Sequence, residues 1–450
     1  LLSFCNRNNH MKTLNRLISL YQKGDLQNAL KLAELLIEKN PEIAKIHNFL
    51  GLINSSLYKN EESLKNFSKA TEIKKNYAEA HNNKGVLLNQ MGRFKEASKE
   101  FNKAITIRPY YAAAYKGQGD NLIDLGKYEE GIQNYSKALD LKPDFTDARI
   151  KLIESLSFLN SKKQESNSFV STNNLLQNLK LDYDLNKKIS DEEVIDFFQK
   201  SNEILFKNIK NHEEIEFDNR QLFRRGNFDL NCERHKTIFE NFNTIAKYCF
   251  GCFKVQIDPK NIIDLIKLFL VFDRLELPNN KNTKKCLIEM RPDISGSYKG
   301  LVFCFSLKEA EEVKIILTEI LTKVISKTIK IGIKRGCTEF GVAHPKYKEV
   351  DKKEEDLMKY NEKWLANEKL LDERLPKRKT SKERVVLGTN SGISLNDILV
   401  IHNWLIYAKK IGDLSYKKIV KNDQEILSSP NMDMDMSLQL SERVSYFSNN

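Results

Sequence analysis

Residues 78–111 read AEAHNNKGVLLNQMGRFKEASKEFNKAITIRPYY, and residues 112–145 follow the same pattern as AAAYKGQGDNLIDLGKYEEGIQNYSKALDLKPDF. A helix pair of this length cannot bury its apolar face alone, so successive copies must stack into a solenoid. Solenoids present long surfaces that bind other chains, so the repeat predicts recognition rather than chemistry. The residues that recur every 34 positions are Gly51, Gly85 and Gly119; Phe67, Phe101 and Tyr135; and Ala70, Ala104 and Ala138.

The pattern resembles the tetratricopeptide repeat (TPR) family. Gly85, Ala97, Phe101 and Pro109 stand where that family places a small residue, alanine, an aromatic residue and a helix-ending proline. The copy that follows departs at Gly131, where the family prefers alanine. The resemblance implies an α-solenoid of antiparallel helix pairs in a TPR protein of bacterial type. We expect four repeats and a capping helix over residues 10–160.

The resemblance also implies that the first helix of each repeat lines a concave groove. Short polar side chains there suit an extended peptide backbone, because an amide both donates and accepts hydrogen bonds. A clamp for a terminal carboxylate is not favoured, since Lys116 is the only cation among these positions and Asp120 lies close to it. A merely solvated asparagine-rich surface is the alternative. The predicted peptide-binding residues are Asn48, Ser55, Asn82, Asn83, Asn89, Lys116 and Asp120.

Composition limits the class of protein. The 450 residues carry a net charge of +12, which favours acidic partners unless biased codon usage alone enriches lysine and asparagine. No apolar run approaches the roughly 18 residues of a membrane span. Seven cysteines, an odd number, predict a reducing cytoplasm with thiols or a metal site rather than a disulfide framework. Met11 is a candidate start, in which case residues 1–10 are not translated.

A second domain is predicted after a polar linker at residues 161–189. Residues 190–411 alternate short apolar strands with amphipathic helices in the order β-α-β-β-α-β, which favours a separate α+β domain of ferredoxin-like type. Alternation places Lys254, Gln256, Lys330 and Lys334 on the open face of its sheet, where they could meet RNA phosphates; a face that is solvated or covered by a helix is the alternative. Residues 412–450 lack periodicity and are predicted to be a disordered tail.

Cysteine and histidine spacing gives the most specific chemical signal. Cys232 and His235 form a C-x2-H pair, and Cys249 and Cys252 follow thirteen residues later as C-x2-C. Three thiolates and one imidazole satisfy tetrahedral zinc, and a site filled by protein ligands is structural. The alternatives are an iron–sulfur cluster that adds Cys286, and ordinary buried cysteines with a surface histidine.

Three functions remain open on the sequence alone. The first is a protein- or peptide-binding TPR scaffold fused to an uncharacterised basic domain. The second is an enzyme of transferase or oxygenase type whose repeats select a protein substrate; Cys337 with His344 is its candidate thiolate and base. The third is an RNA-binding module. Arg291 and Arg335, next to strand ends, are candidates for holding an anion.

Overall fold

The chain forms two compact units. The computed structural model describes residues 2–158, 167–181, 183–209, 215–224, 232–279, 282–292, 294–374, 393–420, 426–427 and 430–449. One unit comprises Leu1–Lys151 with Lys369–Lys382, and the other comprises Leu152–Glu368 with Glu383–Asn450. Among the helices within the described ranges, none is both long and apolar enough to cross a membrane.

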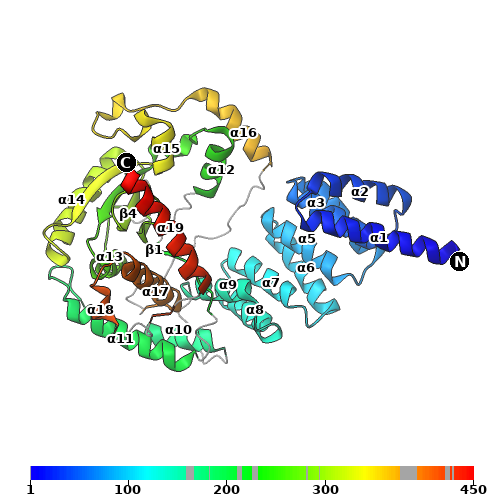
Figure 1. The fold of residues 1–450 in the computed structure, drawn as a ribbon, viewed down its shortest axis with the longest axis horizontal. Helices are drawn as coiled ribbons and strands as arrows, with labels where there is room; N and C mark the ends of the chain where they lie inside the picture. The colour runs from blue at the N-terminus through cyan, green and yellow to red at the C-terminus, as the bar shows by residue number, and fades with distance from the viewer. Residues whose placement is uncertain are drawn as a thin grey trace. The chain divides into compact units, whose positions relative to one another are not determined.

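The first unit consists of consecutive antiparallel helices (Figure 1). Each apolar face is covered by the helix before it and the helix after it, which is how a repeat array shares one core. The helices are α1 (Leu2–Gln22), α2 (Leu26–Lys39), α3 (Ala44–Ser56), α4 (Asn60–Ile73), α5 (Ala78–Gln90), α6 (Phe94–Ile107), α7 (Ala112–Asp124), α8 (Tyr128–Leu141) and α9 (Thr146–Leu156).

Glycine and aromatic residues fix the distance between paired helices. A Cβ atom on Gly85 would lie 2.9 Å from Cδ1 of Phe101, and one on Gly117 would lie 2.4 Å from Cε1 of the same ring. The ring therefore fills the space that both glycines leave, and it is 1% exposed. At Gly131 the departure from alanine also has a steric reason, because a Cβ there would lie 2.7 Å from Cδ1 of Ile123.

A buried polar cluster joins α5 to α6. Nδ1 of His81 lies 2.6 Å from Oε2 of Glu100, and its Nε2 lies 3.1 Å from the Lys75 carbonyl. Lys103 donates to the other oxygen of Glu100 at 3.1 Å, and Lys84 lies 3.7 Å from it. Burial by itself raises the pKa of Glu100, but these donors and charges outweigh burial and lower it from 4.5 to about 2.

Substitution of Glu100 by glutamine should flatten the acid sensitivity of the repeats. A carboxyl whose pKa is lowered by folding stabilises the folded state above its unfolded pKa, and that contribution is lost as the pH falls from about 4.5 towards 2. The lost contribution is roughly 3 kcal/mol. Hydrogen exchange of α5 and α6, measured between neutral and acid pH, checks this. Replacing the exposed Glu129 is the control, and an unchanged acid profile in the Glu100→Gln variant would contradict the assignment.

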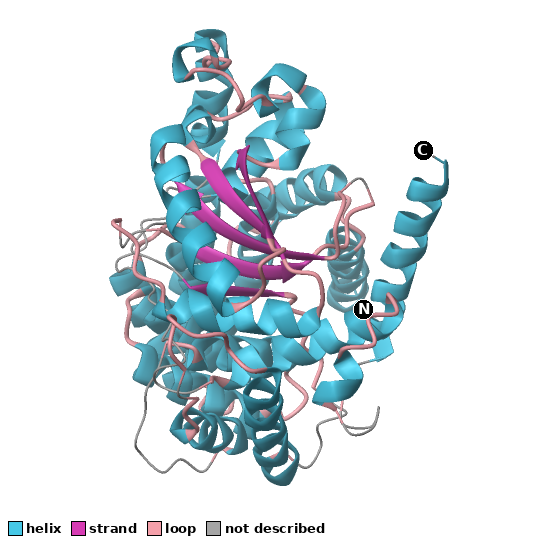
Figure 2. Ribbon diagram, turned by 90° about the vertical axis from the view of Figure 1, so that its left-hand side faces the viewer, coloured by secondary structure: helices cyan, strands magenta, loops and turns pink. Residues whose placement is uncertain are grey.

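The second unit is built on one antiparallel sheet, drawn in magenta in Figure 2. Its strand order is β1-β3-β4-β2-β5. The strands are β1 (Gln221–Arg224), β2 (Phe253–Asp258), β3 (Lys284–Ile288), β4 (Tyr298–Cys304) and β5 (Lys330–Arg335). The helices are α10 (Ser168–Asn178), α11 (Asp191–Asn208), α12 (Cys232–Phe242), α13 (Ile262–Arg274), α14 (Leu307–Val324), α15 (Thr338–Ala343), α16 (Leu365–Arg374), α17 (Leu395–Lys410), α18 (Tyr416–Ile419) and α19 (Pro430–Asn449).

One face of the sheet packs on helices α13 and α14. Val255 of the inner strand β2 is fully buried there, and a Cβ on Gly300 of β4, which pairs with Ile257 of β2, would lie 2.3 Å from Leu268 of α13. Strand alternation therefore places Lys254 and Gln256 on the opposite face, as the sequence predicts. Lys254 is nevertheless only 5% exposed, so that face is not an open cationic surface around it.

Two segments differ from the sequence prediction. The expected linker at residues 161–189 contains helix α10. This helix packs into the unit, because Asn173 is fully buried and its Oδ1 accepts a hydrogen bond from the Leu395 amide at 2.9 Å. Residues 161–166 and 182 of that linker lie outside the described ranges. The expected disordered tail contains α18 and α19, and Met432 and Met436 of α19 are buried. Methionines one turn apart supply an apolar stripe within a polar sequence.

Candidate functional site

Amides of the predicted peptide groove bond to one another between repeats. Nδ2 of Asn83 donates to Oδ1 of Asn48 at 3.1 Å. Nδ2 of Asn89 donates to Asn121 at 3.2 Å and to Asp124 at 3.1 Å. Several of the predicted peptide-binding residues thus also hold neighbouring repeats together. Asn82 is different, because its buried Oδ1 has no hydrogen-bond partner among the described residues.

Carboxylates surround the lysine of the groove. Nζ of Lys116 lies 3.0 Å from Asp120 and 2.6 Å from Asp147. Asp120 also accepts a hydrogen bond from the Tyr135 hydroxyl at 2.8 Å. Burial by itself lowers the pKa of Lys116, but these carboxylates outweigh it and raise the pKa. Lys116 therefore stays protonated, and its charge is already offset by two carboxylates. It is poorly suited to bind the carboxylate of a peptide. Ser55 is partly exposed on the same row of helices.

A cavity of about 270 Å³ lies in the second unit. All four residues of the predicted zinc site, Cys232, His235, Cys249 and Cys252, line it. Cys337, which the sequence suggested only as a thiolate paired with His344, lines the same cavity. Its other walls are Lys236, Phe239, Glu240, Tyr248, Lys254, Gly336, Glu339 and Phe340.

Backbone geometry explains why Cys337 reaches the cavity. Strand β5 runs antiparallel to β2, so its last residue, Arg335, pairs with the first residue of β2, Phe253. The Gly336 amide then donates to the Cys252 carbonyl at 2.8 Å. Gly336 has a φ of +54°, and a Cβ there would lie 2.1 Å from the Tyr347 hydroxyl, so no other residue fits without displacement.

A second backbone contact shapes the pair Cys249 and Cys252. The Cys252 amide donates to the Cys249 carbonyl at 3.1 Å, which closes a tight turn between the two thiols. The Tyr347 hydroxyl donates to the same carbonyl at 2.6 Å. Burial raises the pKa of the Cys252 thiol to about 11 and also raises that of Cys249. Without a metal, both sulfurs are therefore protonated at neutral pH.

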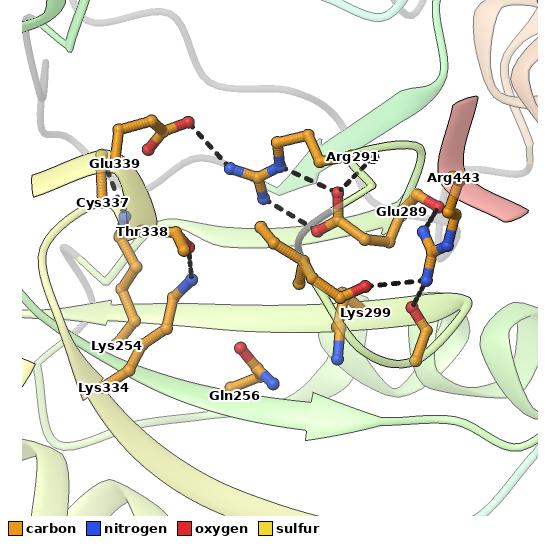
Figure 3. A network of polar contacts seen from close by, with 12 residues as sticks. Lys254, Gln256, Glu289, Arg291, Lys299, Lys334, Cys337, Thr338, Glu339 and Arg443 are labelled. Atoms are coloured by element: carbon orange, nitrogen blue, oxygen red, sulfur yellow. Dashed lines mark hydrogen bonds and ion pairs between the residues drawn. The ribbon is translucent and has the colours of Figure 1, made fainter. Parts of the chain in front are cut away.

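Lys254 brings a positive charge to the cavity. Figure 3 shows its side chain beside that of Lys334 on one face of the sheet, reaching towards Cys337. Its Nζ donates to the Gly336 carbonyl at 2.9 Å, lies 3.5 Å from Sγ of Cys337 and lies 4.9 Å from the centre of the Phe303 ring. None of the ion pairs found within the described ranges involves Lys254. Burial, followed by the charge of Lys254, lowers the pKa of Lys334 to about 8.

The other predicted residues have different partners. Arg291 donates to Glu289 and Glu339 at 2.8–2.9 Å (Figure 3), and Arg335 donates to the Phe250 carbonyl at 2.8 Å. Both arginines are thus engaged within the chain. His344 lies 3.2 Å from the Asn243 carbonyl, whereas Cys337 has Lys254 as its polar neighbour. These contacts direct the thiol and the imidazole to different partners, so they do not support a thiolate and base acting together.

Cys286 lies away from the cavity. It pairs with Gly300, which faces α13, so its thiol points to the helix-covered side of the sheet. Burial raises the pKa of this thiol well above its ordinary value. Cys286 is therefore not a ligand of an iron–sulfur cluster at this cavity, contrary to the predicted alternative. Within the described ranges, no three histidine, cysteine or acidic side chains are arranged to hold a single metal ion.

Family models match the repeats. The model described as tetratricopeptide repeat matches residues 78–111, and the model described as TPR repeat matches residues 119–152. Together with the stacked helix pairs, these matches confirm the predicted family: the first unit of this chain is an array of tetratricopeptide repeats. Such arrays generally serve as scaffolds for protein interaction. No protein of curated function matches the chain.

Several solved structures are similar to part of this chain. MamA of Desulfovibrio magneticus RS-1, from residue 41 to its end, is 20% identical over 32% of this chain and 82% of its own, with a TM-score of 0.30. A thermophilic TPR protein of Thermus thermophilus, TTC0263, is 17% identical over 46% and 94%, with a TM-score of 0.31. The Arabidopsis OM64 TPR domain is 18% identical over 26% and 98%, with a TM-score of 0.26. These low scores carry no argument about function.

Proposed function

We propose that the TPR array binds an extended peptide segment of a partner protein, and that the fused unit is a metal-stabilised domain of ferredoxin-like type. Support for peptide binding comes chiefly from the groove amides. Asn48 and Asn82 occupy the same position in successive repeats, and the unpartnered Oδ1 of Asn82 within the described residues suits a peptide N–H donor. The predicted groove holds more negative than positive charge, which favours a peptide with basic side chains. The charged residues are Lys116, Asp120, Asp124 and Asp147.

Two observations support the proposal for the second unit. Strands β3, β4, β2 and β5 are adjacent in that order and wholly antiparallel, and α13 and α14 form the two crossings of a split β-α-β arrangement. Strand β1 is then a fifth strand, added to the sheet beside β3. Cys232, His235, Cys249 and Cys252 line one cavity, which favours a structural metal, and zinc is the ion that the sequence predicts, although no three of these side chains are arranged around a single ion within the described ranges. A reducing compartment such as the cytoplasm would keep these thiols available.

Binding of selected peptides tests the groove. Random peptides displayed on phage are selected on the full chain, and the affinity of the selected peptides is measured by fluorescence anisotropy. The double substitution Asn48→Ala with Asn82→Ala should weaken binding by about thirty-fold, because each lost amide removes about 1 kcal/mol and the two together remove about 2 kcal/mol. Asn134→Ala is the matched control, since the hydrogen bond of its amide runs to the Glu130 carbonyl of its own helix.

Two outcomes would contradict peptide binding. One is failure to enrich any peptide on the full chain. The other is equal affinity for the groove variant and for the Asn134→Ala control. Circular dichroism of each variant shows whether the helices are retained, because Asn48 also contacts Asn83 of the next repeat.

A further inference from the structure

We propose that the thiol-lined cavity binds one four-iron iron–sulfur cluster through Cys232, Cys249, Cys252 and Cys337. This inference rests on the proposed metal-bearing role of the second unit. It differs from the zinc site predicted by the sequence in two respects: the fourth ligand is Cys337 instead of His235, and the bound group is larger than one ion.

The ligand set follows from the arrangement of the thiols. Four cysteines line one cavity, and the bond from the Gly336 amide to the Cys252 carbonyl brings Cys337 next to the Cys249–Cys252 turn. Four thiolates are a complete set for a four-iron cluster, so no imidazole is needed. The His235 ring is buried and stacks on Tyr248 at 5.2 Å, which makes it part of the wall.

The number of thiols at one cavity and the size of that cavity favour a cluster over a single ion. A tetrahedral zinc ion bonds each sulfur at about 2.3 Å, which draws its thiolates to roughly 4 Å from one another. No three such side chains within the described ranges are arranged in that way, although four thiols line the same cavity of about 270 Å³. A cluster of four irons fills a space of this kind and holds its cysteines farther apart than one ion does.

The surroundings of the cavity suit a cluster as well. Buried Phe340 and half-buried Phe239 form apolar walls, which limit the access of solvent to a cluster on that side of the cavity. The ammonium group of Lys254 is buried and lies 3.5 Å from Sγ of Cys337. A cluster with four thiolate ligands carries net negative charge, so a buried cation beside one sulfur offsets the cost of burying that charge.

Metal and sulfide analysis of the full chain tests the proposal. The protein is purified without oxygen and then incubated with ferrous iron and sulfide, and bound iron, zinc and acid-labile sulfide are measured. We expect about four iron and about four sulfide per chain, with a broad visible absorption. Cys337→Ser should reduce iron and sulfide to background. Cys286→Ala and His235→Ala should retain them, Cys286→Ala being the matched control for loss of a buried thiol outside the cavity.

Each other outcome has a definite meaning. One zinc per chain without sulfide, lost in His235→Ala, would overturn the cluster and leave the structural metal site of the proposed function intact. Iron and sulfide retained in Cys337→Ser would overturn the ligand set. A wild-type chain without metal after both treatments would overturn the cluster and the proposed metal site together. The wild-type measurement does not depend on whether any variant folds.

Discussion

Replacing Arg224 with methionine should destabilise the second unit by about 3–5 kcal/mol, because two buried carboxylates then lose the cation that pairs with both of them. The guanidinium group pairs with Asp273 and lies 3.1 Å from Asp397, and its carbon lies 4.3 Å above the centre of the Phe269 ring. Burial by itself lowers the pKa of Arg224, but the two carboxylates outweigh burial and raise it. Urea denaturation, followed by tryptophan fluorescence, measures the loss.

Companion variants separate charge from packing. Adding Asp273→Leu and Asp397→Asn to Arg224→Met should recover most of the stability, because an apolar replacement of a whole buried ion network is often nearly neutral. Acid conditions should recover part of it, since protonated carboxyls tolerate burial better. Lys200→Met, which removes an exposed pair with Asp196, should change stability by less than about 1 kcal/mol. A similarly small effect of Arg224→Met would contradict the argument.

Local signals in the sequence predicted much of the second unit. Ser306 with Glu309 three residues later is a helix-capping pattern, and α14 begins directly after it at Leu307, with Ser306 accepting from the Glu309 amide at 3.1 Å. Asp258 and Pro259 are also a good cap and first-turn pair, which would begin helix α13 at residue 260. It begins at Ile262, because Asn261 is the residue that caps it, accepting from the Asp264 amide at 2.9 Å. Neighbouring residues can each cap the same helix. The first residue of a helix is therefore harder to predict from sequence than the existence of the helix.

Long-range burial could not be predicted in the same way. Arg224 stands at the end of a short strand, and no local pattern shows that residues 49 and 173 positions away supply its carboxylates. Helix α19 was missed for a similar reason. The sequence of α19 is polar and shows no clear period. Its Arg443 donates hydrogen bonds to the carbonyls of Ile294 and Gly296, and these contacts exist only in the folded unit.

Cys337 could have been predicted as a cavity residue. The order β-α-β-β-α-β places the last strand antiparallel to the first in a ferredoxin-like sheet. The residue just after the last strand, Gly336, must then lie next to the residue just before the first strand, Cys252, and Cys337 follows Gly336 directly. Spacing along the chain drew attention to His235 instead, because it is three residues from Cys232. Topology was therefore the better indicator of which thiols share a cavity.

The largest effect expected in the repeats comes from Phe101→Ala, which should destabilise the array by about 3–5 kcal/mol, because the cavity left by the ring cannot close. The ring touches Gly85 of its own repeat and Gly117 of the next, so its loss weakens both interfaces. In an array whose stability is the sum of repeats and interfaces, hydrogen exchange should rise most in α5, α6 and α7. Tyr110→Ala is the control, since Tyr110 is 82% exposed and its loss should change little.

A double-mutant cycle tests whether glycine and ring are matched in size. Gly85→Ala alone should cost about 1–3 kcal/mol, since its Cβ would lie 2.9 Å from the Phe101 ring. Combined with Phe101→Leu, the same alanine should cost less, because the smaller side chain leaves room for the added methyl group. The coupling energy is therefore expected to be favourable by about 1 kcal/mol. Additive losses in the double variant would show that Gly85 is needed for its backbone and not for the space that it leaves to Phe101.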